Sequence, residues 1–317
     1  MTTTVPPALP FLLAELEVAS VERLSPSFVR LELASAALAD LGLDGPVLDQ
    51  RIKLVFPHGD RPLPSIEGAD ESWTASWTDR PVEERGHMRT YTVREVRGSG
   101  VDTRLVVDIV LHEGDGPEGP GAAWAAAAEV GDRVITLAPR RGHEFGGVEF
   151  VPGTASELLL VGDETAVPAV AGILRDLPSR ARGAAFLEVP LAGDVQTLEH
   201  PEGMSITWLP RDGAGRGTAL HQAVLDHLGA PLEPLGALEP IEVDDDLWET
   251  PTYSSSGEPV QEAVSVVGHD LAGLYAWIAG EAKVVTGLRR ALVRDLGVDR
   301  HQVAFMGYWR SGVAMKS

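Results

Sequence analysis

Two patterns of apolar residues divide this chain of 317 residues, and they restrict its fold more than any other feature. Over residues 11–110, short runs such as FVRLELAS alternate apolar and polar residues and are separated by Gly, Pro and Asp. This period of two is typical of half-buried antiparallel strands. From residue 157 onward, apolar runs such as ELLLVG alternate with amphipathic stretches such as TALHQAVLDHL. Strands that alternate with helices predict a parallel sheet covered by helices.

The pattern changes around VPGTAS, and we place a domain boundary at residue 152. We expect residues 1–152 to form a small antiparallel barrel and residues 153–317 to form an α/β domain. In the first domain, residues 64–86 are polar and predict a long surface loop, and residues 119–130 predict a short helix. In the second domain, an acidic stretch around residues 232–262 predicts an extended, solvated insertion.

Composition excludes several classes of protein. The sequence has no cysteine, which excludes disulfides and a Cys-ligated iron–sulfur cluster, so electron transfer would need an organic cofactor or a partner. A net charge of −21, spread over both halves, repels nucleic acid and anionic membranes. No apolar run approaches the roughly 20 residues of a membrane span, and the first residues do not resemble a secretory signal. We therefore expect a cytoplasmic protein, and the nine dispersed His residues predict no metal site.

The first candidate site is the predicted strand RTYTVR at residues 89–94. Alternation places Arg89, Tyr91 and Val93 on one face of the strand and the residues between them on the other. A guanidinium group pairs bidentately with phosphate, and a Tyr ring offers a rigid surface for stacking. The same residues also suit an ordinary strand, so the motif alone leaves both interpretations open.

A second candidate is the glycine-rich segment HEGDGPEGPGAAWA at residues 112–125. A glycine turn that leads into a helix can bind an anion, because free amides and the positive end of the helix dipole meet there. Later in the chain, GDETAVPA at residues 162–169 lies where a strand turns into a helix, and its acids also suit an ordinary first helical turn. WIAGE at residues 277–281 and GYWR at residues 307–310 end two later predicted strands.

Taken in order, these blocks resemble the siderophore-interacting protein family, the FAD-dependent ferric-siderophore reductases of the ferredoxin reductase superfamily. PRRG at residues 139–142 and LRR at residues 288–290 add to the resemblance, which extends from about residue 15 to residue 312. Two departures lie in the glycine turn, where extra residues follow His112 and Ala122 stands where the family usually has Ser. The resemblance implies a six-stranded antiparallel flavin-binding barrel followed by a nicotinamide-binding α/β domain.

The resemblance also implies roles for individual residues. Arg89 would bind the phosphates of FAD, and Tyr91 and Thr92 would be the catalytic residues, the first lying on the isoalloxazine and the second bonding near flavin N5. The remaining FAD contacts would come from Val110, His112, Gly119, Gly121, Ala122 and Ala123. NADPH or NADH would be bound by Gly162, Asp163, Glu164, Thr165, Pro168, Arg211, Gly280, Glu281 and Trp309, with Arg211 as the candidate for a 2′-phosphate.

Three basic residues are candidates for binding an anionic ferric siderophore. Lys53 is one of three lysines and resembles the family's barrel lysine, and Arg140 and Arg141 follow the last predicted barrel strand. Because the net charge gives no long-range attraction for an anion, capture would depend on such a short-range basic pocket. Lys53 equally suits an exposed position on an ordinary strand.

The activity that the resemblance implies is the release of iron from a ferric siderophore. A hydride would pass from NAD(P)H to FAD, and single electrons would then reduce Fe(III) to Fe(II). Two alternatives stay open: a general flavin or electron-transfer reductase, and a non-catalytic siderophore-binding module. The sequence also leaves NADPH, NADH and ferredoxin open as electron donors, and we expect a monomer.

Overall fold

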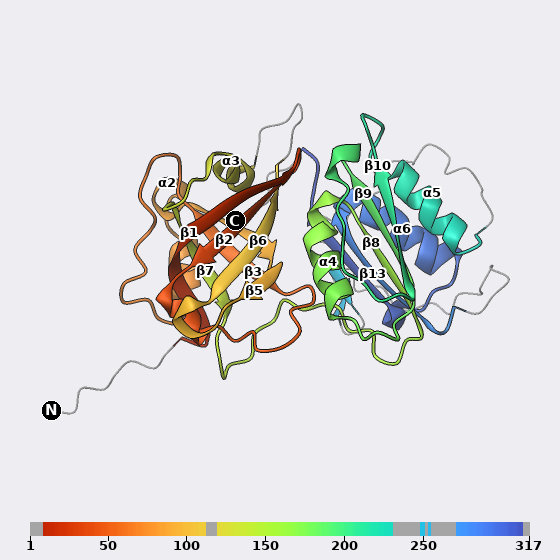
Figure 1. The fold of residues 1–317 in the computed structure, drawn as a ribbon, viewed down its shortest axis with the longest axis horizontal. Helices are drawn as coiled ribbons and strands as arrows, with labels where there is room; N and C mark the ends of the chain where they lie inside the picture. Colours follow the sequence, from red (N-terminus) through yellow and green to blue (C-terminus); the bar gives the residue numbers. More distant parts are fainter. Residues whose placement is uncertain (1–8, 112–118, 231–247, 251–252, 255–270, 313–317) are drawn as a thin grey trace. The chain divides into compact units, whose positions relative to one another are not determined.

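The structure is a computed structural model that describes residues 9–111, 119–230, 248–250, 253–254 and 271–312. The described chain divides into two compact units (Figure 1). The first holds residues 9–24 and 28–147, and the second holds residues 25–27 and 148–312. The expected boundary was at residue 152. The acidic insertion expected around residues 232–262 lies largely outside the described residues.

The first unit is an antiparallel half-barrel, which confirms the predicted class of fold. Its strands follow one another across the sheet in the order β4-β3-β7-β1-β2-β6-β5. Their bounds are β1 Phe11–Ser25, β2 Phe28–Ala34, β3 Arg51–Phe56, β4 His87–Thr92, β5 Glu95–Arg97, β6 Arg104–Val110 and β7 Arg133–Pro139.

The sheet has seven strands where six were expected, because one predicted strand changes partner. β4 pairs with β3, and β5 pairs with β6. Between them, the amide of Val93 donates to the carbonyl of Gln50, and the amide of Arg94 donates to the carbonyl of Val106. The segment therefore leaves one end of the strand order and joins the other end within two residues.

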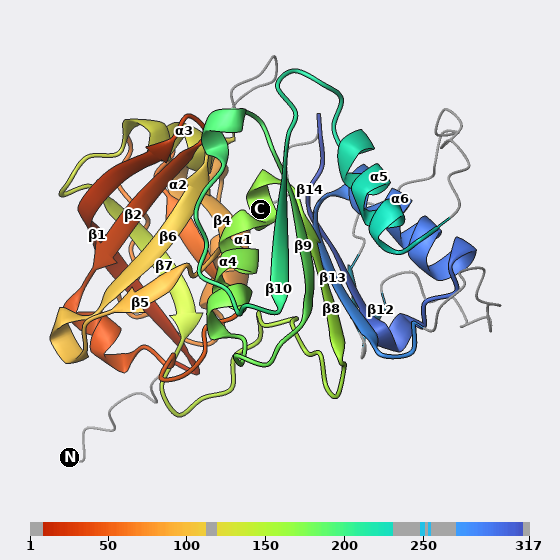
Figure 2. The same ribbon diagram turned by 45° about the vertical axis from the view of Figure 1, so that its right-hand side comes forward.

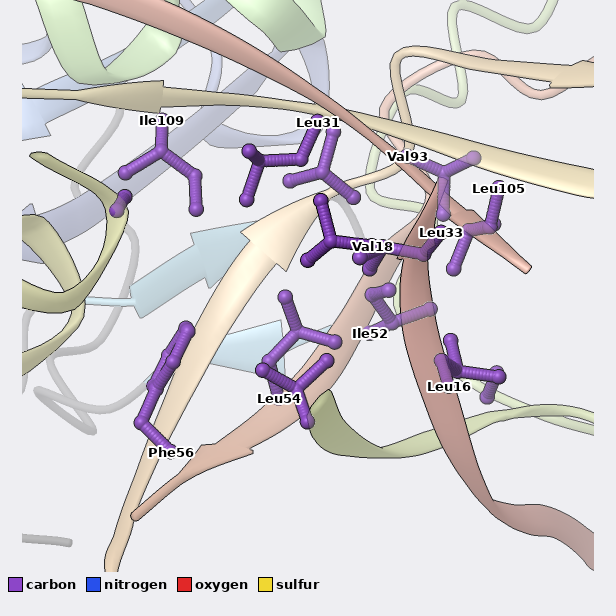
Figure 3. Close-up of a cluster of buried hydrophobic side chains, with 14 of the residues drawn as sticks. Leu16, Val18, Leu31, Leu33, Ile52, Leu54, Phe56, Val93, Leu105 and Ile109 are labelled. Atoms are coloured by element: carbon purple, nitrogen blue, oxygen red, sulfur yellow. The ribbon is translucent and has the colours of Figure 1, made fainter. Parts of the chain in front are cut away.

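The core of the half-barrel consists of the alternate residues that point inward from each strand (Figure 3). Leu31 and Leu33 come from β2, and Ile52 and Leu54 come from β3; all four are almost completely buried. Each such side chain contributes about 1.5–3 kcal/mol by leaving water. The period of two in the sequence is thus the direct cause of the inward face.

The segment expected as a surface loop at residues 64–86 is instead partly helical, with α1 at Trp73–Thr78 and α2 at Val82–Arg85. Trp73 and Trp77 are buried and pack against Val55 and Ile135 on the other face of the sheet. The indole of Trp77 donates a hydrogen bond of 2.7 Å to the carbonyl of Arg85. The prediction was wrong because helices this short show no usable periodicity.

The second unit has the expected parallel sheet between helices. Its parallel strands are β8 Glu157–Gly162, β9 Gly183–Val189, β10 Met204–Pro210, β13 Leu274–Glu281 and β14 Val303–Trp309, in the order β10-β9-β8-β13-β14. Two short strands, β11 Trp248–Thr250 and β12 Tyr253–Ser254, continue the sheet antiparallel beyond β14. Helix α4, Val167–Asp176, covers one face of the sheet, and α5, Thr218–His227, and α6, Ala282–Arg289, cover the other (Figures 1 and 2).

The strand order reverses between β8 and β13, which marks the usual ligand crevice of an open α/β sheet. Gly162 ends β8 at this point. A Cβ atom on Gly162 would lie 2.4 Å from the Cβ of Ala166, so only glycine lets the turn into α4 approach the strand. This switch point lies at the carboxyl ends of the strands, where several predicted site residues are found.

The helix that follows β13 changes form along its length. α6 ends at Arg289, and a π-helical turn continues over Arg290–Asp295. Within the residues described, no helix combines the length and the apolar character that crossing a membrane requires.

Candidate functional site

Tyr91 and Arg89 lie on the same face of β4. In the antiparallel register, Tyr91 is opposite Ile52 and Arg89 is opposite Leu54, so both point to the face that carries the core of the half-barrel. The Tyr91 ring meets Phe56 edge-on, with ring centroids 5.8 Å apart. The period of two predicted that Arg89 and Tyr91 would share a face, and the register confirms it.

Helix α3, Pro120–Ala127, forms the wall against which Tyr91 rests. A Cβ atom on Gly121 would lie 2.1 Å from the Tyr91 hydroxyl oxygen and 3.1 Å from Phe56, so glycine at this position creates the space for the phenol. Trp124 of the same helix packs against Phe56. Burial raises the pKa of Tyr91, so the phenol stays neutral.

Arg89 carries a charge that nothing in the described structure neutralises. Its Nη1 donates a hydrogen bond of 2.7 Å to the carbonyl of Met88, and no carboxylate among the described residues pairs with it. Burial lowers the pKa of the guanidinium, with Tyr91 opposing and Arg85 adding to that shift. A partly buried guanidinium without an acid partner is well suited to a phosphate ligand.

The other residues predicted to bind FAD lie around this position or outside the described chain. Thr92 ends β4 and is buried, and Val110 ends β6. Gly119 is the N-cap of α3 and supplies no side chain to cap it, so first-turn amides face no capping side chain. Ala122 and Ala123 belong to the first turn of α3, whereas His112 lies outside the described residues.

The three residues predicted to bind substrate differ in their partners. Lys53 lies on the other face of β3 from Ile52, and its Nζ donates a hydrogen bond of 2.6 Å to the Thr90 hydroxyl. Partial burial and the neighbouring Arg51 lower the pKa of Lys53. The described residues include no carboxylate that pairs with it.

Arg140 and Arg141 are both neutralised by acids of the segment before β3. Arg140 lies 3.0 Å from a carboxylate oxygen of Asp40 and also donates to the carbonyl of Leu9. Arg141 pairs with Asp44. The predicted basic pocket therefore contains one lysine without an acid partner and two arginines that already have one.

In the second unit, one buried carboxylate joins three of the predicted motifs. Asp163 follows β8 and is 1% exposed. One of its oxygens accepts bonds from the amide and the hydroxyl of Thr165, at 2.9 and 2.5 Å. The other accepts from the amide of Glu281 at 2.7 Å and from the indole of Trp309 at 2.8 Å.

The environment of Asp163 favours its neutral form. Burial is the main cause and Glu164 the second, and together they outweigh the hydrogen bonds and raise the pKa of Asp163 to about 6. Gly280 permits the close approach: with φ at +150°, it carries no Cβ atom, which would lie 2.8 Å from the Asp163 carboxyl carbon. Glycine is therefore required at position 280 by the carboxylate beside it.

A second group of charges surrounds Glu164. Arg211 binds both oxygens of Glu164, at 2.8 and 3.0 Å, and lies 3.3 Å from Glu188. The Arg211 side chain is only 8% exposed. Its charge thus neutralises two buried acids, so Arg211 stabilises the fold at this position. Its predicted role at a 2′-phosphate stays a prediction.

Arg216 is the more accessible cation of this group. Its Nη1 lies 3.0 Å from Glu164, its side chain is 34% exposed, and its guanidinium lies 4.6 Å from the ring centroid of Trp309. Among the described residues, groups of three or more His, Asp or Glu suited to a metal ion are absent.

Glu281 and Pro168 shape the starts of the two helices that follow β8 and β13. Glu281 ends β13 and caps α6, because one of its oxygens accepts bonds from the amides of Lys283 and Val284 at 2.7 and 3.2 Å. Its other oxygen accepts from the amide of Ser311 at 3.1 Å. Pro168 lies in the first turn of α4, where its missing amide costs nothing.

Two residues of this network were missed by the sequence analysis. Glu188 is the last residue but one of β9, and its oxygens accept from the amide of Gly217 at 2.9 and 3.0 Å. An acid within the otherwise apolar run AAFLEV was a signal for it. Arg216 lies in the loop after β10, and only its contacts with Glu164 and Trp309 distinguish it from Arg211.

Comparison with known proteins assigns both units to one family. The profile of the family described as "Siderophore-interacting FAD-binding domain" matches residues 17–143, and that described as "Siderophore-interacting protein" matches residues 155–312. The ferric vibriobactin reductase ViuB of Vibrio cholerae is 30% identical over 92% of this chain and 92% of its own. This chain belongs to the siderophore-interacting protein family.

Solved structures agree with this assignment. The chain is similar to a siderophore utilization protein from T. fusca, with 30% identity, a TM-score of 0.67, and coverage of 98% of this chain and 97% of the other. A ferredoxin NADP+ reductase from Neisseria gonorrhoeae with bound FAD and NADP shares the fold at a TM-score of 0.55, with 12% identity and coverage of 94% and 99%. Membership of the family and the ferredoxin reductase-like fold confirm the resemblance seen in the sequence.

Substitution of Gly121 by Ala should weaken FAD binding. The new methyl group would displace the Tyr91 phenol, and an affinity loss of about tenfold corresponds to only about 1.4 kcal/mol. Titration of the apoprotein with FAD, followed by flavin fluorescence, measures the effect. Gly45→Ala is the matched control, since a Cβ atom there meets nothing within 4 Å. Equal FAD affinity in the two variants would refute the role given to Gly121.

Asp163 should make the stability of the protein depend on pH between about 4 and 6. Its folded-state pKa of about 6 lies above the ordinary Asp value of 3.8, so over this range the folded protein holds a proton that the unfolded chain releases. This contribution is complete below pH 4 and is lost as the pH rises through 6, a change of about 3 kcal/mol at most.

Denaturant unfolding of wild type and of Asp163→Asn at several pH values tests this expectation. Asn cannot accept all the hydrogen bonds of Asp163, so the variant should be less stable overall, but it lacks the titrating group. The stability difference between the two proteins should therefore shrink as the pH rises from 4 to 7. Parallel pH profiles would contradict the assignment.

Proposed function

We propose that this protein is an FAD-dependent reductase that releases iron from ferric siderophores as Fe(II), with NAD(P)H as electron donor. The observation that carries the proposal is the pairing of Tyr91, seated on the glycine of α3, with the acid-free guanidinium of Arg89. It lies in a unit that matches a siderophore-interacting FAD-binding domain. A relative of nearly the same length is named as a ferric vibriobactin reductase. We further propose that the protein acts in the cytoplasm as a monomer.

The residues of the first unit fit a flavin. Arg89 would bind the pyrophosphate together with the amides at the start of α3, and Tyr91 would lie against the isoalloxazine. Thr92, at the end of β4, would place a hydroxyl beside flavin N5. When bound, FAD would supply the chemistry that converts a two-electron hydride donor into a one-electron reductant of Fe(III). The neutral phenol of Tyr91 avoids placing a second negative charge against a reduced flavin.

The second unit supplies a site for the nucleotide donor at the carboxyl ends of β8 and β13, the switch point of the sheet. The amide of Thr165 is already bonded to Asp163, so the turn after β8 offers less to a phosphate than a glycine-rich turn would. We therefore assign the phosphate contact to a side chain. Arg216 is preferred to Arg211 because it is four times more exposed, at 34% against 8%.

Substrate capture must occur against an unfavourable field, because the protein carries a net charge of −21 and many ferric siderophores are anionic. Lys53 is the best supported contact of the three predicted, since no carboxylate in the described chain neutralises it. Arg140 and Arg141 would contribute only if their partners Asp40 and Asp44 released them. Oxygen chelators hold Fe(II) more weakly than Fe(III), so reduction would release the metal.

Turnover with ferric siderophores tests the function directly. The purified protein should be yellow and should reduce ferric siderophores faster than it reduces free flavin or dyes, measured by trapping Fe(II) with a chromogenic chelator. A colourless protein that binds siderophore would support the binding-module alternative. Equal rates on dyes and siderophores would support a general reductase. Reduction of the flavin by ferredoxin but not by NAD(P)H would identify ferredoxin as the electron donor.

The Lys53→Ala variant tests the substrate contact. It should raise KM for an anionic ferric siderophore by about tenfold or less, because a partly screened charge contact loses most of its strength to desolvation. KM for a neutral hydroxamate complex should change less, and flavin content should not change. If both KM values move together, or if neither moves, Lys53 is an ordinary strand residue.

Arg216→Ala tests the donor site. It should raise KM for NADPH by roughly 10- to 100-fold, the value of a charge-assisted contact of about 1.5–3 kcal/mol, and should leave KM for NADH nearly unchanged. Arg211→Ala should instead lower stability, because it leaves Glu164 and Glu188 buried beside a missing charge. Stopped-flow reduction with both nucleotides separates the variants. If a stable Arg211→Ala protein loses its preference for NADPH, the contact with the 2′-phosphate belongs to Arg211 and not to Arg216.

A further inference from the structure

The indole of Trp309 makes two polar contacts at the carboxyl ends of the strands in the second unit. Its Nε1 donates a hydrogen bond of 2.8 Å to Asp163, and the guanidinium of Arg216 lies over its ring, 4.6 Å from the centroid. Trp309 is half-buried and ends β14. The proposed function uses Arg216 but gives the indole no role, although the two side chains are in contact.

An irregularity in the pairing of β13 with β14 brings the indole to this position. Gly280 lies opposite Gly307, but the next residue of β13, Glu281, lies opposite Trp309. One extra residue of β14 thus falls between two paired positions, which is the pattern of a β-bulge. A bulge changes the direction of the side chains beside it, and here the indole reaches the carboxylate of Asp163, which follows β8.

Arg216 keeps most of its hydrogen-bonding capacity for a ligand. Within the described part of the chain, its guanidinium makes a single hydrogen bond, from Nη1 to Glu164 at 3.0 Å. Its Nε and Nη2 atoms form another edge of the group, and such an edge can bind two oxygens of one phosphate. Glu164 does not depend on Arg216 alone, because Arg211 binds both of its oxygens. Arg216 can therefore bind a phosphate while Glu164 stays neutralised.

The Trp309 ring restricts the orientation in which Arg216 presents this edge. Arg216 belongs to the loop after β10, and ordering a long side chain costs free energy when a ligand binds. A cation over a Trp ring is held there by electrostatic attraction. The bond to Glu164 fixes one nitrogen of the guanidinium and the ring supports its face, so the edge is oriented before a ligand arrives.

We propose that Trp309 determines the selectivity for a nucleotide with a 2′-phosphate, because it holds the Arg216 guanidinium in the orientation that binds this phosphate. Trp309 is a positioning residue, which acts through Arg216 and does not itself contact the phosphate. Asp163 acts one step further away, since its carboxylate fixes the indole. This inference rests on the proposed donor site and deepens it.

Calorimetric titration of the purified protein with adenosine 2′,5′-bisphosphate and with 5′-AMP tests this role, because the two ligands differ only in the 2′-phosphate. Wild type should bind the bisphosphate more tightly than AMP. Trp309→Leu should reduce this preference by roughly two- to fivefold, the value of a cation–π contact at a partly exposed site, and should leave the affinity for AMP unchanged. Trp309→Phe keeps a ring but has no N–H group, so its preference should lie between the two.

The same substitution in an Arg216→Ala background shows whether Trp309 acts through Arg216. Once the guanidinium is absent, Trp309→Leu should have no further effect on the preference, so the two substitutions should not be additive. Equal effects of Trp309→Leu in the two backgrounds, or an unchanged preference in Trp309→Leu alone, would overturn the role given to Trp309. A wild type that binds both ligands equally would overturn the assignment of Arg216 in the proposed donor site, and this inference with it.

Trp208→Leu is the matched control. Trp208 is another half-buried Trp of the same sheet, on β10, and it lies outside the described contacts of Arg216 and Asp163. Its preference for the bisphosphate should equal that of wild type. Denaturant unfolding shows whether Trp309→Leu is folded. If it is not, Trp309→Phe takes its place in both backgrounds, and the same two outcomes support or overturn the role.

Discussion

The hydrogen bonds to the carboxylate of Asp163 are the interaction on which the strand ends of the second unit depend. This carboxylate accepts hydrogen bonds from the turn after β8, from the last residue of β13 and from an indole at the end of β14. These three strands are neighbours in the sheet, so one buried group fixes the relative positions of their carboxyl ends. A carboxylate this buried is tolerated only because all of its lone pairs have donors. Glu164 likewise links the turn after β8 to β9 and β10, because it pairs with Arg211, which also pairs with Glu188.

The basic side chains of this acidic protein fall into two groups that have different physical roles. One group has acid partners and stabilises contacts between segments of the chain; it consists of Arg140, Arg141 and Arg211. Arg89 and Arg85 have none among the described residues, and each is partly buried. The net charge alone predicted only that an anion must be bound by nearby cations. Which cations are available depends on whether each has an acid partner in the fold, and the sequence does not show those partners.

The fold was predictable because it is expressed in local periodicity. The period of two gave the half-barrel, and the alternation of strands and helices gave the parallel sheet with its site at the strand ends. That Arg89 and Tyr91 share a face also followed from alternation. What could not be predicted depends on which strands are neighbours. Glu188 and Arg211 meet only because β9, β10 and β8 lie side by side, and two short helices bury Trp73 and Trp77 without any periodic signal.

The change of partner at Val93 and Arg94 has a mechanical consequence for the half-barrel. β4 stands at one end of the strand order and β5 at the other, yet they are consecutive in the chain and are joined by two residues. Three residue steps of extended chain span at most about 11 Å, so this connection holds the two ends of the strand order close to each other. The sheet must therefore curl, and the curvature around Tyr91 is set by a covalent link as well as by packing.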